Sequence, residues 1–159
     1  MTPKATSTAT SSKRAASHAS EIGPGVFIGG WKDAETFEGT RFCVLDEAPP
    51  EMPAATHVPI YDEATRQPIV DNLDRLARLI GEARGRREPV LVFCGHGVRR
   101  SPLAGAWYLH RAEGLTLDAA FAKVRRARPG VEHVQAWAKG WTVLESDPAR
   151  TASTHRSGR

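Results

Sequence analysis

Cysteine is scarce in this chain of 159 residues, which holds only two. Two cysteines cannot form the disulfide framework of a small secreted domain, so the composition favours a reducing, cytoplasmic compartment. Long apolar runs are also missing. No stretch approaches the roughly eighteen residues of a membrane-spanning helix, and no charged-then-apolar leader opens the sequence. These absences predict a globular protein with no membrane partner.

Metal-binding and nucleic-acid signatures are absent as well. No pair of histidines, cysteines or carboxylates has the spacing of a metal site, so no metal and no other cofactor is expected. The formal charge is +4, but no basic stripe interleaved with aromatic residues accompanies it, which argues against a nucleic-acid partner. We interpret the basic excess mainly as a solvated surface.

Both ends of the sequence are short of apolar residues. Residues 1–20 contain no acidic, aromatic or large aliphatic residue beyond Met1, and residues 147–159 are similarly polar. Segments of this kind cannot bury enough apolar surface to become ordered. They are predicted to be disordered tails that the fold does not need. The folded unit is then a single domain over about 21–146.

Short apolar runs and helical periodicities alternate within this unit. Strands are predicted over 25–30, 41–47, 56–61 and 89–93. The last of them is apolar on both faces, as in the middle of a parallel sheet, whereas Pro59 makes the third short or close to an edge. Helices are predicted over 69–86, 102–109, 115–128 and 132–145. The alternation indicates an α/β domain with a mostly parallel central sheet flanked by helices.

One cysteine directly follows the most apolar strand, in the stretch CGHGVRRSP at residues 94–102. Its two glycines allow a tight turn that exposes backbone N–H groups. A helix beginning near Pro102 adds unpaired N–H donors and the positive end of its dipole. Loops at this end of parallel strands are where such sheets bind ligands. The stretch predicts a cradle for a tetrahedral oxyanion, formed by Gly95, His96, Gly97, Val98, Arg99 and Arg100.

The side chains of this loop suit nucleophilic chemistry on phosphorus. Arg100 offers a planar fork that matches two phosphate oxygens. Together with the helix N-terminus it favours the thiolate form of Cys94, which predicts a nucleophile. Ser101 is placed to donate a hydrogen bond to the sulfur. Arg99 either widens the positive field for a polyanionic ligand or points to solvent.

The run from Cys94 to Ser101 resembles the C-x5-R-S signature of the cysteine-dependent protein phosphatases, and Gly97 also matches that signature. The RSP ending and the short chain resemble the dual-specificity branch, and the likeness extends over most of 21–146. The resemblance implies the cysteine-phosphatase fold, hydrolysis through a phosphocysteine without a cofactor, and a phosphorylated protein as substrate. One position departs from the family. Phe93 stands where a histidine usually precedes the nucleophile, which leaves the rate and the pH optimum open.

Hydrolysis of a phosphate monoester also needs an acid that protonates the leaving oxygen. If the strands at 56–61 and 89–93 are joined through the intervening helix, they are parallel and end at the same edge of the sheet. Asp62 follows the first strand as Cys94 follows the second. The family also keeps its general acid at this relative position. Asp62 is therefore predicted to be the general acid, with Glu63 and Asp46 as alternatives.

Other functions remain open on the sequence. A phosphate-reading binding module with little turnover is one, because Phe93 departs from the family pattern. A sulfurtransferase of the rhodanese kind is another, because Arg99 also gives C-x4-R, although the RSP ending argues against it. Within the enzyme interpretation, a phosphoinositide or an RNA 5′-phosphate is an alternative substrate. Several residues are assigned to the core or its edge: Cys43, His110, Trp137 and Trp141.

Overall fold

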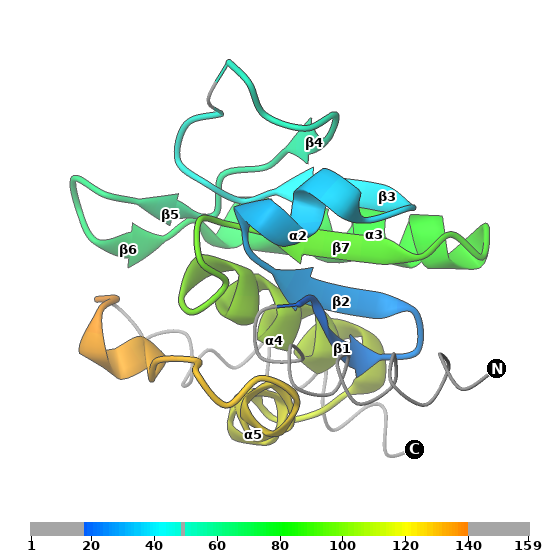
Figure 1. Ribbon diagram of the computed structural model, residues 1–159. Coiled ribbons are helices and arrows are strands. Elements are labelled where there is room, and N and C mark those ends of the chain that lie inside the picture. Colours follow the sequence, from blue (N-terminus) through cyan, green and yellow to red (C-terminus); the bar gives the residue numbers. More distant parts are fainter. Residues whose placement is uncertain (1–17, 49, 140–159) are drawn as a thin grey trace, which may run out of the picture.

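The computed structural model describes residues 18–48 and 50–139 and consists of one sheet with helices on both faces (Figure 1). The sheet has the strand order β1-β2-β7-β3-β4. These strands are β1 (Ser20–Gly23), β2 (Val26–Gly29), β7 (Val90–Phe93), β3 (Thr40–Cys43) and β4 (Thr56–His57). β1 pairs with β2 in the antiparallel sense, and all other neighbours are parallel. The predicted α/β class with a mostly parallel sheet is confirmed.

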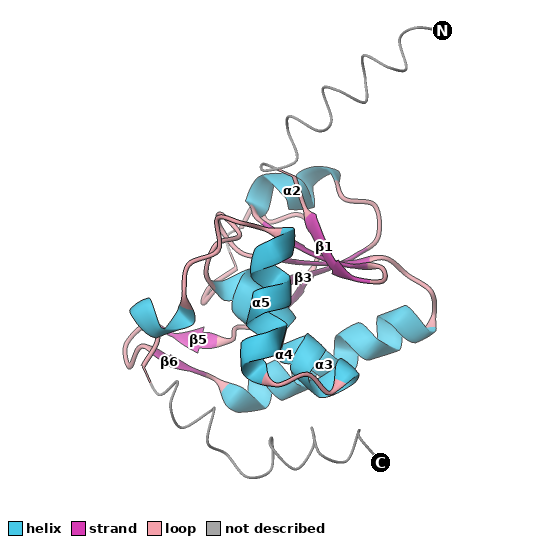
Figure 2. Ribbon diagram, turned by 90° about the horizontal axis from the view of Figure 1, so that it is seen from below, coloured by secondary structure: helices cyan, strands magenta, loops and turns pink. Residues whose placement is uncertain are grey.

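Three long helices cover one face of the sheet and a short helix covers the other (Figure 2). The long helices are α3 (Val70–Gly85), α4 (Arg100–Glu113) and α5 (Leu117–Ala127), and the short one is α2 (Trp31–Thr36). A separate hairpin, β5 (Tyr61–Asp62) with β6 (Gln67–Pro68), and a 3-10 turn, η2 (Val134–Ala136), complete the fold. Within residues 18–48 and 50–139, no helix is long and apolar enough to cross a membrane.

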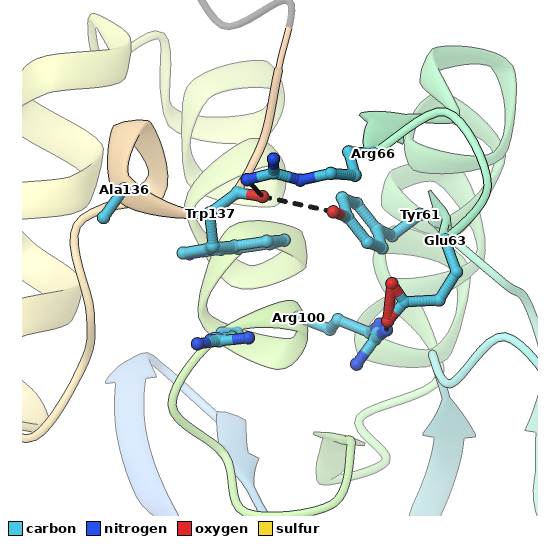
Figure 3. A pocket seen from close by; sticks show the side chains of 7 residues that line it. Tyr61, Glu63, Arg66, Arg100, Ala136 and Trp137 are labelled. Carbon is cyan, nitrogen blue, oxygen red and sulfur yellow. Dashed lines mark hydrogen bonds and ion pairs between the residues drawn. The ribbon is translucent and has the colours of Figure 1, made fainter.

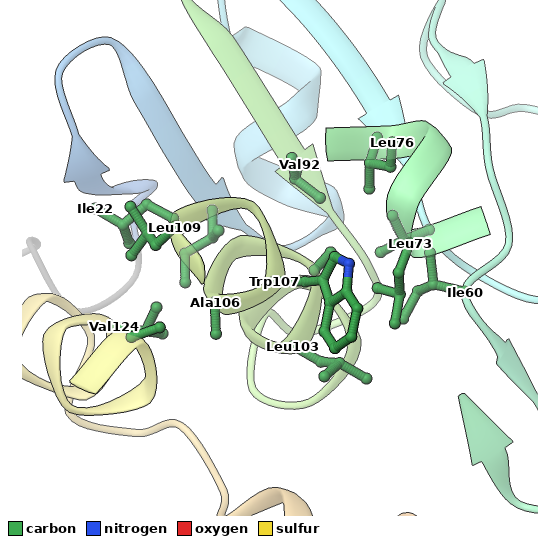
Figure 4. Packing of buried hydrophobic residues seen from close by; sticks show 14 of the residues in the cluster. Ile22, Ile60, Leu73, Leu76, Val92, Leu103, Ala106, Trp107, Leu109 and Val124 are labelled. Carbon is green, nitrogen blue, oxygen red and sulfur yellow. The ribbon is translucent and has the colours of Figure 1, made fainter. Parts of the chain in front are cut away.

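The alternation of side chains along β7 divides the core into two parts. Val90 and Val92 face α3 and α4 in the main cluster, whereas Leu91 and Phe93 belong to a second cluster with Ala34 of α2. All four strand residues are fully buried, as expected for the central strand of a parallel sheet. The main cluster is organised around Trp107 of α4 (Figure 4), whose Nε1 donates to Asp74 Oδ1 at 2.7 Å.

The elements that position the loop at residues 94–101 agree with the sequence. α3 follows the predicted periodicity, with Leu73, Leu76 and Ile80 buried along one side. α5 ends one residue before the predicted boundary, and β7 occupies the predicted strand. β4 is an edge strand, as Pro59 indicated. α4 begins at Arg100 rather than at Pro102, so the last residues of the loop form the first helical turn.

Other predictions are corrected by the structure. The run 56–61 does not form one strand, because β4 ends at His57 and Tyr61 pairs in the β5–β6 hairpin instead. The run 41–47 leaves the sheet after Cys43. β1 and α2 were not predicted, and Ser20 belongs to β1 rather than to a tail. Of the helix predicted over 132–145, the described part forms only η2. Trp141 and the C-terminal tail lie outside the described residues, as do residues 1–17.

Candidate active site

Cys94 lies where β7 ends and the loop to α4 begins. Its Sγ accepts hydrogen bonds from the backbone N–H of Gly97 at 3.3 Å and of Ser101, in the first turn of α4, at 3.4 Å. The side chain is nearly buried. It lies in a depression of about 320 Å³, lined by Leu45, Cys94, Gly95, His96, Val98, Arg99, Arg100 and Glu132. The sulfur therefore combines access from solvent with two fixed N–H donors.

The hydroxyl of Ser101 is the third group at the sulfur. Ser101 is fully buried, and its Oγ donates to the carbonyl of Gly29 at 3.0 Å. The Cys94 thiol donates in turn to Ser101 Oγ at 3.4 Å. A hydroxyl has only one proton to donate. To stabilise a thiolate, Ser101 would turn this proton from Gly29 to the sulfur. The structure thus brings together the two residues that the sequence predicted to cooperate.

The carbonyl groups of the loop are all held from outside. Gly95 O accepts from Trp31 N–H at 3.0 Å, and Val98 O accepts from Glu132 N–H at 2.9 Å. Arg128 Nε donates to Gly97 O at 2.8 Å, and its Nη2 makes a longer contact of 3.4 Å with His96 O. In a trans peptide the N–H points away from the C=O. The N–H groups of residues 96–99 therefore face the inner side of the loop.

Three of these four inward N–H groups have no acceptor. The amide of Gly97 donates to Cys94 Sγ, whereas the amides of His96, Val98 and Arg99 donate to no group in the described part of the chain. Unpaired backbone donors that converge on one space form an anion site. These amides lie in the loop where the sequence predicts an oxyanion cradle, and that role stays a prediction.

Close approach of β2 to the loop depends on glycine. Gly97 has φ of +75°, and a Cβ there would lie 2.7 Å from the carbonyl carbon of Gly29. A Cβ at Gly30 would lie 2.8 Å from Gly95 O. Sequence reasoning missed the role of Gly29 and Gly30, although a glycine pair at the end of an apolar strand is the signal that marks such contacts.

Arg100 is surrounded by acidic and aromatic groups (Figure 3). Its Nη2 donates to Glu63 Oε2 at 2.9 Å, its Nε lies 3.2 Å from Asp46 Oδ1, and its guanidinium lies over the ring of Tyr61 at 5.1 Å. Burial raises the pKa of Asp46, and the positive charge of Arg100 opposes this shift. Arg99 behaves differently, because it pairs with Glu132 at the exposed rim.

The predicted acid, Asp62, lies in the β5–β6 hairpin. β4, β3 and β7 are parallel, so the chain after β4 returns to the edge of the sheet where Cys94 lies. Asp62 is exposed, and its Oδ1 accepts from Ala64 N–H at 3.0 Å. Asp62 forms no hydrogen bond or ion pair with Arg100, whereas the two alternative acids, Glu63 and Asp46, both contact that arginine.

The hairpin is tied to the segment that follows α5. Tyr61 Oη donates to Trp137 O at 3.1 Å, and Arg66 Nη2 donates to the same carbonyl at 3.3 Å (Figure 3). Lys139 N–H donates in turn to Arg66 O at 2.6 Å. The ring of Trp137 packs edge-on against Tyr61, with 5.1 Å between centroids. Trp137 is buried, as predicted, and it fixes the base of the hairpin that carries Asp62.

Phe93 points away from the loop. Its side chain is fully buried in the second cluster with Cys43 and Leu91, and its ring contacts that of Trp31 at 6.1 Å. Cys94 faces the opposite, main cluster. The residue that departs from the family pattern therefore does not contact the sulfur through its side chain. Burial raises the pKa of the Cys43 thiol, so that thiol is uncharged in its cluster.

No group of three or more histidines, cysteines or carboxylates in the described ranges is arranged to hold a metal ion. His96 is exposed on the loop, and His110 is buried, with Nδ1 at 2.6 Å from Leu115 O. The chemistry available at this site is that of a thiol, backbone N–H donors, an arginine and carboxylates.

The sequence comparisons identify relatives of this chain. Residues 46–139 match the model of the dual specificity phosphatase catalytic domain. The rat dual specificity protein phosphatase 12 is 29% identical over 133 residues, which cover 76% of this chain and 39% of the rat protein. The mouse dual specificity phosphatase 28 is 30% identical over 121 residues, which cover 70% of this chain and 74% of the mouse protein.

A crystal structure of a human DUSP28 variant has the same fold, with a TM-score of 0.68. It is 23% identical in sequence, and the alignment covers 87% of this chain and 97% of that structure. The family model covers more than half of the sequence and includes Cys94, Arg100 and Ser101. The chain belongs to the dual specificity phosphatase family.

Proposed function

We propose that this protein hydrolyses phosphate monoesters of proteins through a phosphocysteine intermediate. The observation that carries the proposal is the set of inward N–H groups around Cys94. The amides of Gly97 and Ser101 contact the sulfur, and three neighbouring amides have no acceptor within residues 18–48 and 50–139. Preorganised donors of this kind stabilise the charge that develops on the oxygens of a transferring phosphoryl group.

The reaction proceeds in two balanced steps. The thiolate of Cys94 attacks phosphorus, the bond from phosphorus to the substrate oxygen breaks, and Asp62 gives its proton to that oxygen. Water then attacks the phosphocysteine, Asp62 takes a proton from the water, and the P–S bond breaks. Inorganic phosphate and the Cys94 thiolate are the products. Ser101 keeps its proton and donates a hydrogen bond to the sulfur as the thiolate leaves.

Arg100 binds two phosphate oxygens in both steps. To do so it exchanges Glu63 for phosphate, because Glu63 holds its outer nitrogen in the unliganded protein. The Glu63 side chain is 66% exposed. Exposed ion pairs of this kind contribute only about 0–1 kcal/mol. A phosphate dianion held at the same time by the loop amides therefore displaces Glu63 readily.

The substrate class follows from family membership. The relatives are named dual specificity phosphatases, and that name implies phosphotyrosine and phosphoserine or phosphothreonine side chains. The position of Phe93 supports turnover rather than mere phosphate binding, because its ring lies across the sheet from the loop. The Arg99 side chain is 52% exposed, whereas that of Arg100 is 19% exposed, and this favours Arg100 as the phosphate-binding arginine over the C-x4-R alternative of a sulfurtransferase.

The experiment compares wild-type protein, Cys94→Ser and Cys43→Ser on an aryl phosphate, phosphopeptides, phosphoinositides and 5′-phosphorylated RNA. We expect Cys94→Ser to abolish turnover while it still binds tungstate, and Cys43→Ser to retain wild-type rates. Full turnover by Cys94→Ser would rule out the thiol mechanism. Tight binding of phosphopeptides by wild-type protein without any turnover would support a binding module instead. Faster turnover of phosphoinositides or of 5′-phosphorylated RNA than of phosphopeptides would assign the substrate to that class instead.

A further inference from the structure

A buried arginine outside the loop holds two of the four loop carbonyls. Arg128 follows α5 directly, and its side chain is 8% exposed. Nε donates to Gly97 O at 2.8 Å, and Nη2 contacts His96 O at 3.4 Å. The other two loop carbonyls are held by backbone N–H groups. Arg128 is thus the side chain on which the orientation of the middle of the loop depends.

The peptide groups that Arg128 holds are those that matter for the sulfur and the oxyanion. The peptide between His96 and Gly97 points its carbonyl to Arg128 and its N–H to Cys94 Sγ. The next peptide points the Gly97 carbonyl to Arg128 and the Val98 N–H to the inside of the loop. Each trans peptide turns as one rigid unit. A carbonyl that rotates away from Arg128 therefore takes an inward N–H with it.

Arg128 is itself held by residues from the beginning of the fold. Its Nη1 donates to His18 O at 2.7 Å and to Ser20 Oγ at 3.0 Å, and Nη2 lies 3.9 Å from Asp33 Oδ2. Asp33 also accepts from Gly30 N–H at 2.9 Å. The guanidinium therefore links β1, α2 and the loop through its donors. A planar group with five donors can make all these contacts at once, whereas an ammonium cannot.

We propose that Arg128 is a positioning residue that keeps the inner N–H groups of the 94–101 loop aimed at the sulfur and at the bound oxyanion. This inference rests on the proposed function of the loop. It assigns no contact with substrate to Arg128, which acts through the peptide groups of His96 and Gly97. Three residues that sequence reasoning left aside, Ser20, Asp33 and Arg128, are thereby connected to the site.

The test uses the full chain with Arg128→Lys, Arg128→Gln and, as a matched control, Arg126→Gln, which changes an exposed arginine near the end of α5. Three quantities are measured: the affinity for tungstate, the pH midpoint of Cys94 alkylation by iodoacetamide in a Cys43→Ser background, and kcat/KM on an aryl phosphate. We expect both Arg128 variants to bind tungstate at least about tenfold more weakly. Their alkylation midpoints should move to higher pH. A misplaced loop costs kcat/KM about 10²-fold.

Each outcome decides the matter. If Arg128→Lys equals the wild type, the positive charge alone suffices and the positioning role is wrong. If both variants lose thermal stability but keep the wild-type tungstate affinity and alkylation midpoint, Arg128 is only structural and the proposal is also wrong. If Arg128→Gln does not fold, Arg128→Lys decides alone. Tungstate binding and alkylation need no turnover, so a wild-type protein without phosphatase activity would refute the proposed function and leave this inference standing.

Discussion

Arg100 is the residue whose surroundings change most between the unliganded and the proposed substrate-bound protein. Two carboxylates and one aromatic ring now surround its guanidinium. Glu63 is exposed and easily replaced, whereas Asp46 is more enclosed and contacts the inner Nε. We therefore expect Asp46 to remain beside Arg100 when phosphate binds and to fix the direction of its fork. Of the two acidic residues of the hairpin, Glu63 pairs with Arg100, whereas Asp62 has no cationic partner in the described structure.

The role of Asp62 shows in the dependence of the rate on the leaving group. An alkyl alkoxide leaves badly without a proton, whereas an activated phenolate hardly needs one. We expect Asp62→Asn to slow hydrolysis of a phosphoserine peptide by about 10²–10⁴-fold, and that of an activated aryl phosphate much less. The ratio of kcat values for the two substrates is the measurement.

Two matched variants accompany this test. Glu63→Gln and Asp46→Asn remove the other carboxylates near Arg100. Both should leave the ratio of the two rates close to that of the wild type, because neither residue is assigned to the leaving group. A change of the ratio in Glu63→Gln or Asp46→Asn, with none in Asp62→Asn, would transfer the role of the acid to that residue.

At the level of the elements, α4 packs closely against β1 and β2, and a glycine makes this possible. A Cβ at Gly105 would lie 2.7 Å from Ile22 Cδ1 and 2.9 Å from Ile28 Cγ2. Alanine favours an isolated helix by about 1 kcal/mol over glycine, but overpacking a core costs about 1–3 kcal/mol. We therefore expect Gly105→Ala to lower the free energy of unfolding by about 1 kcal/mol, measured by urea denaturation.

The control lies in the neighbouring helix. Gly81 is exposed in the interior of α3, and a Cβ there would meet no atom within 4 Å. Gly81→Ala should raise the free energy of unfolding by about 0.5–1 kcal/mol, because only the helix preference acts. Equal stabilisation by both substitutions would mean that α4 and the sheet move apart without cost.

The elements that the sequence predicted are those with a strong local pattern. β7 is continuously apolar, and α3 has a regular apolar spacing, so neither needs tertiary information. β1 and α2 are four and six residues long. α2 buries only Asp33 and Ala34, and one of these is charged. Elements so short carry no measurable hydrophobic period. They form because of tertiary contacts with the sheet and with Arg128.

The residues of the candidate site likewise fall into those that the sequence predicted and those that depend on tertiary structure. Cys94, Arg100 and Ser101 lie within eight successive residues, so the loop and its chemistry could be recognised from the order of residues alone. Arg128 stands in the basic run RRAR, which is typical of a solvated helix end. Arg128 is buried because it contacts β1, which lies more than a hundred residues earlier in the sequence. The contact of Asp46 with Arg100 depends likewise on the order of β3 and β7 in the sheet.

For the whole molecule, the first described residues matter more than their composition indicates. His18 O and Ser20 Oγ accept from Arg128, and Glu21 Oε2 accepts from Gly25 N–H. We compare chains that begin at residue 18 and at residue 22 with the full chain. The second should be less stable by about 1.5–3 kcal/mol, because it leaves donors of a buried guanidinium unpaired. Thermal unfolding measures the difference, and equal melting temperatures would show that these contacts contribute nothing.

The unpaired amides of the loop also predict a pattern of hydrogen exchange. An N–H without a protein acceptor is protected from exchange only by burial, so the amides of His96, Val98 and Arg99 should exchange far faster than those of β7 beside them. A bound oxyanion would supply the missing acceptors. Occupancy of the site is then measured as slowed exchange of these three loop amides, while the amides of the sheet keep their rates. Hydrogen exchange of the loop amides would therefore detect a bound oxyanion whether or not the protein is catalytically active.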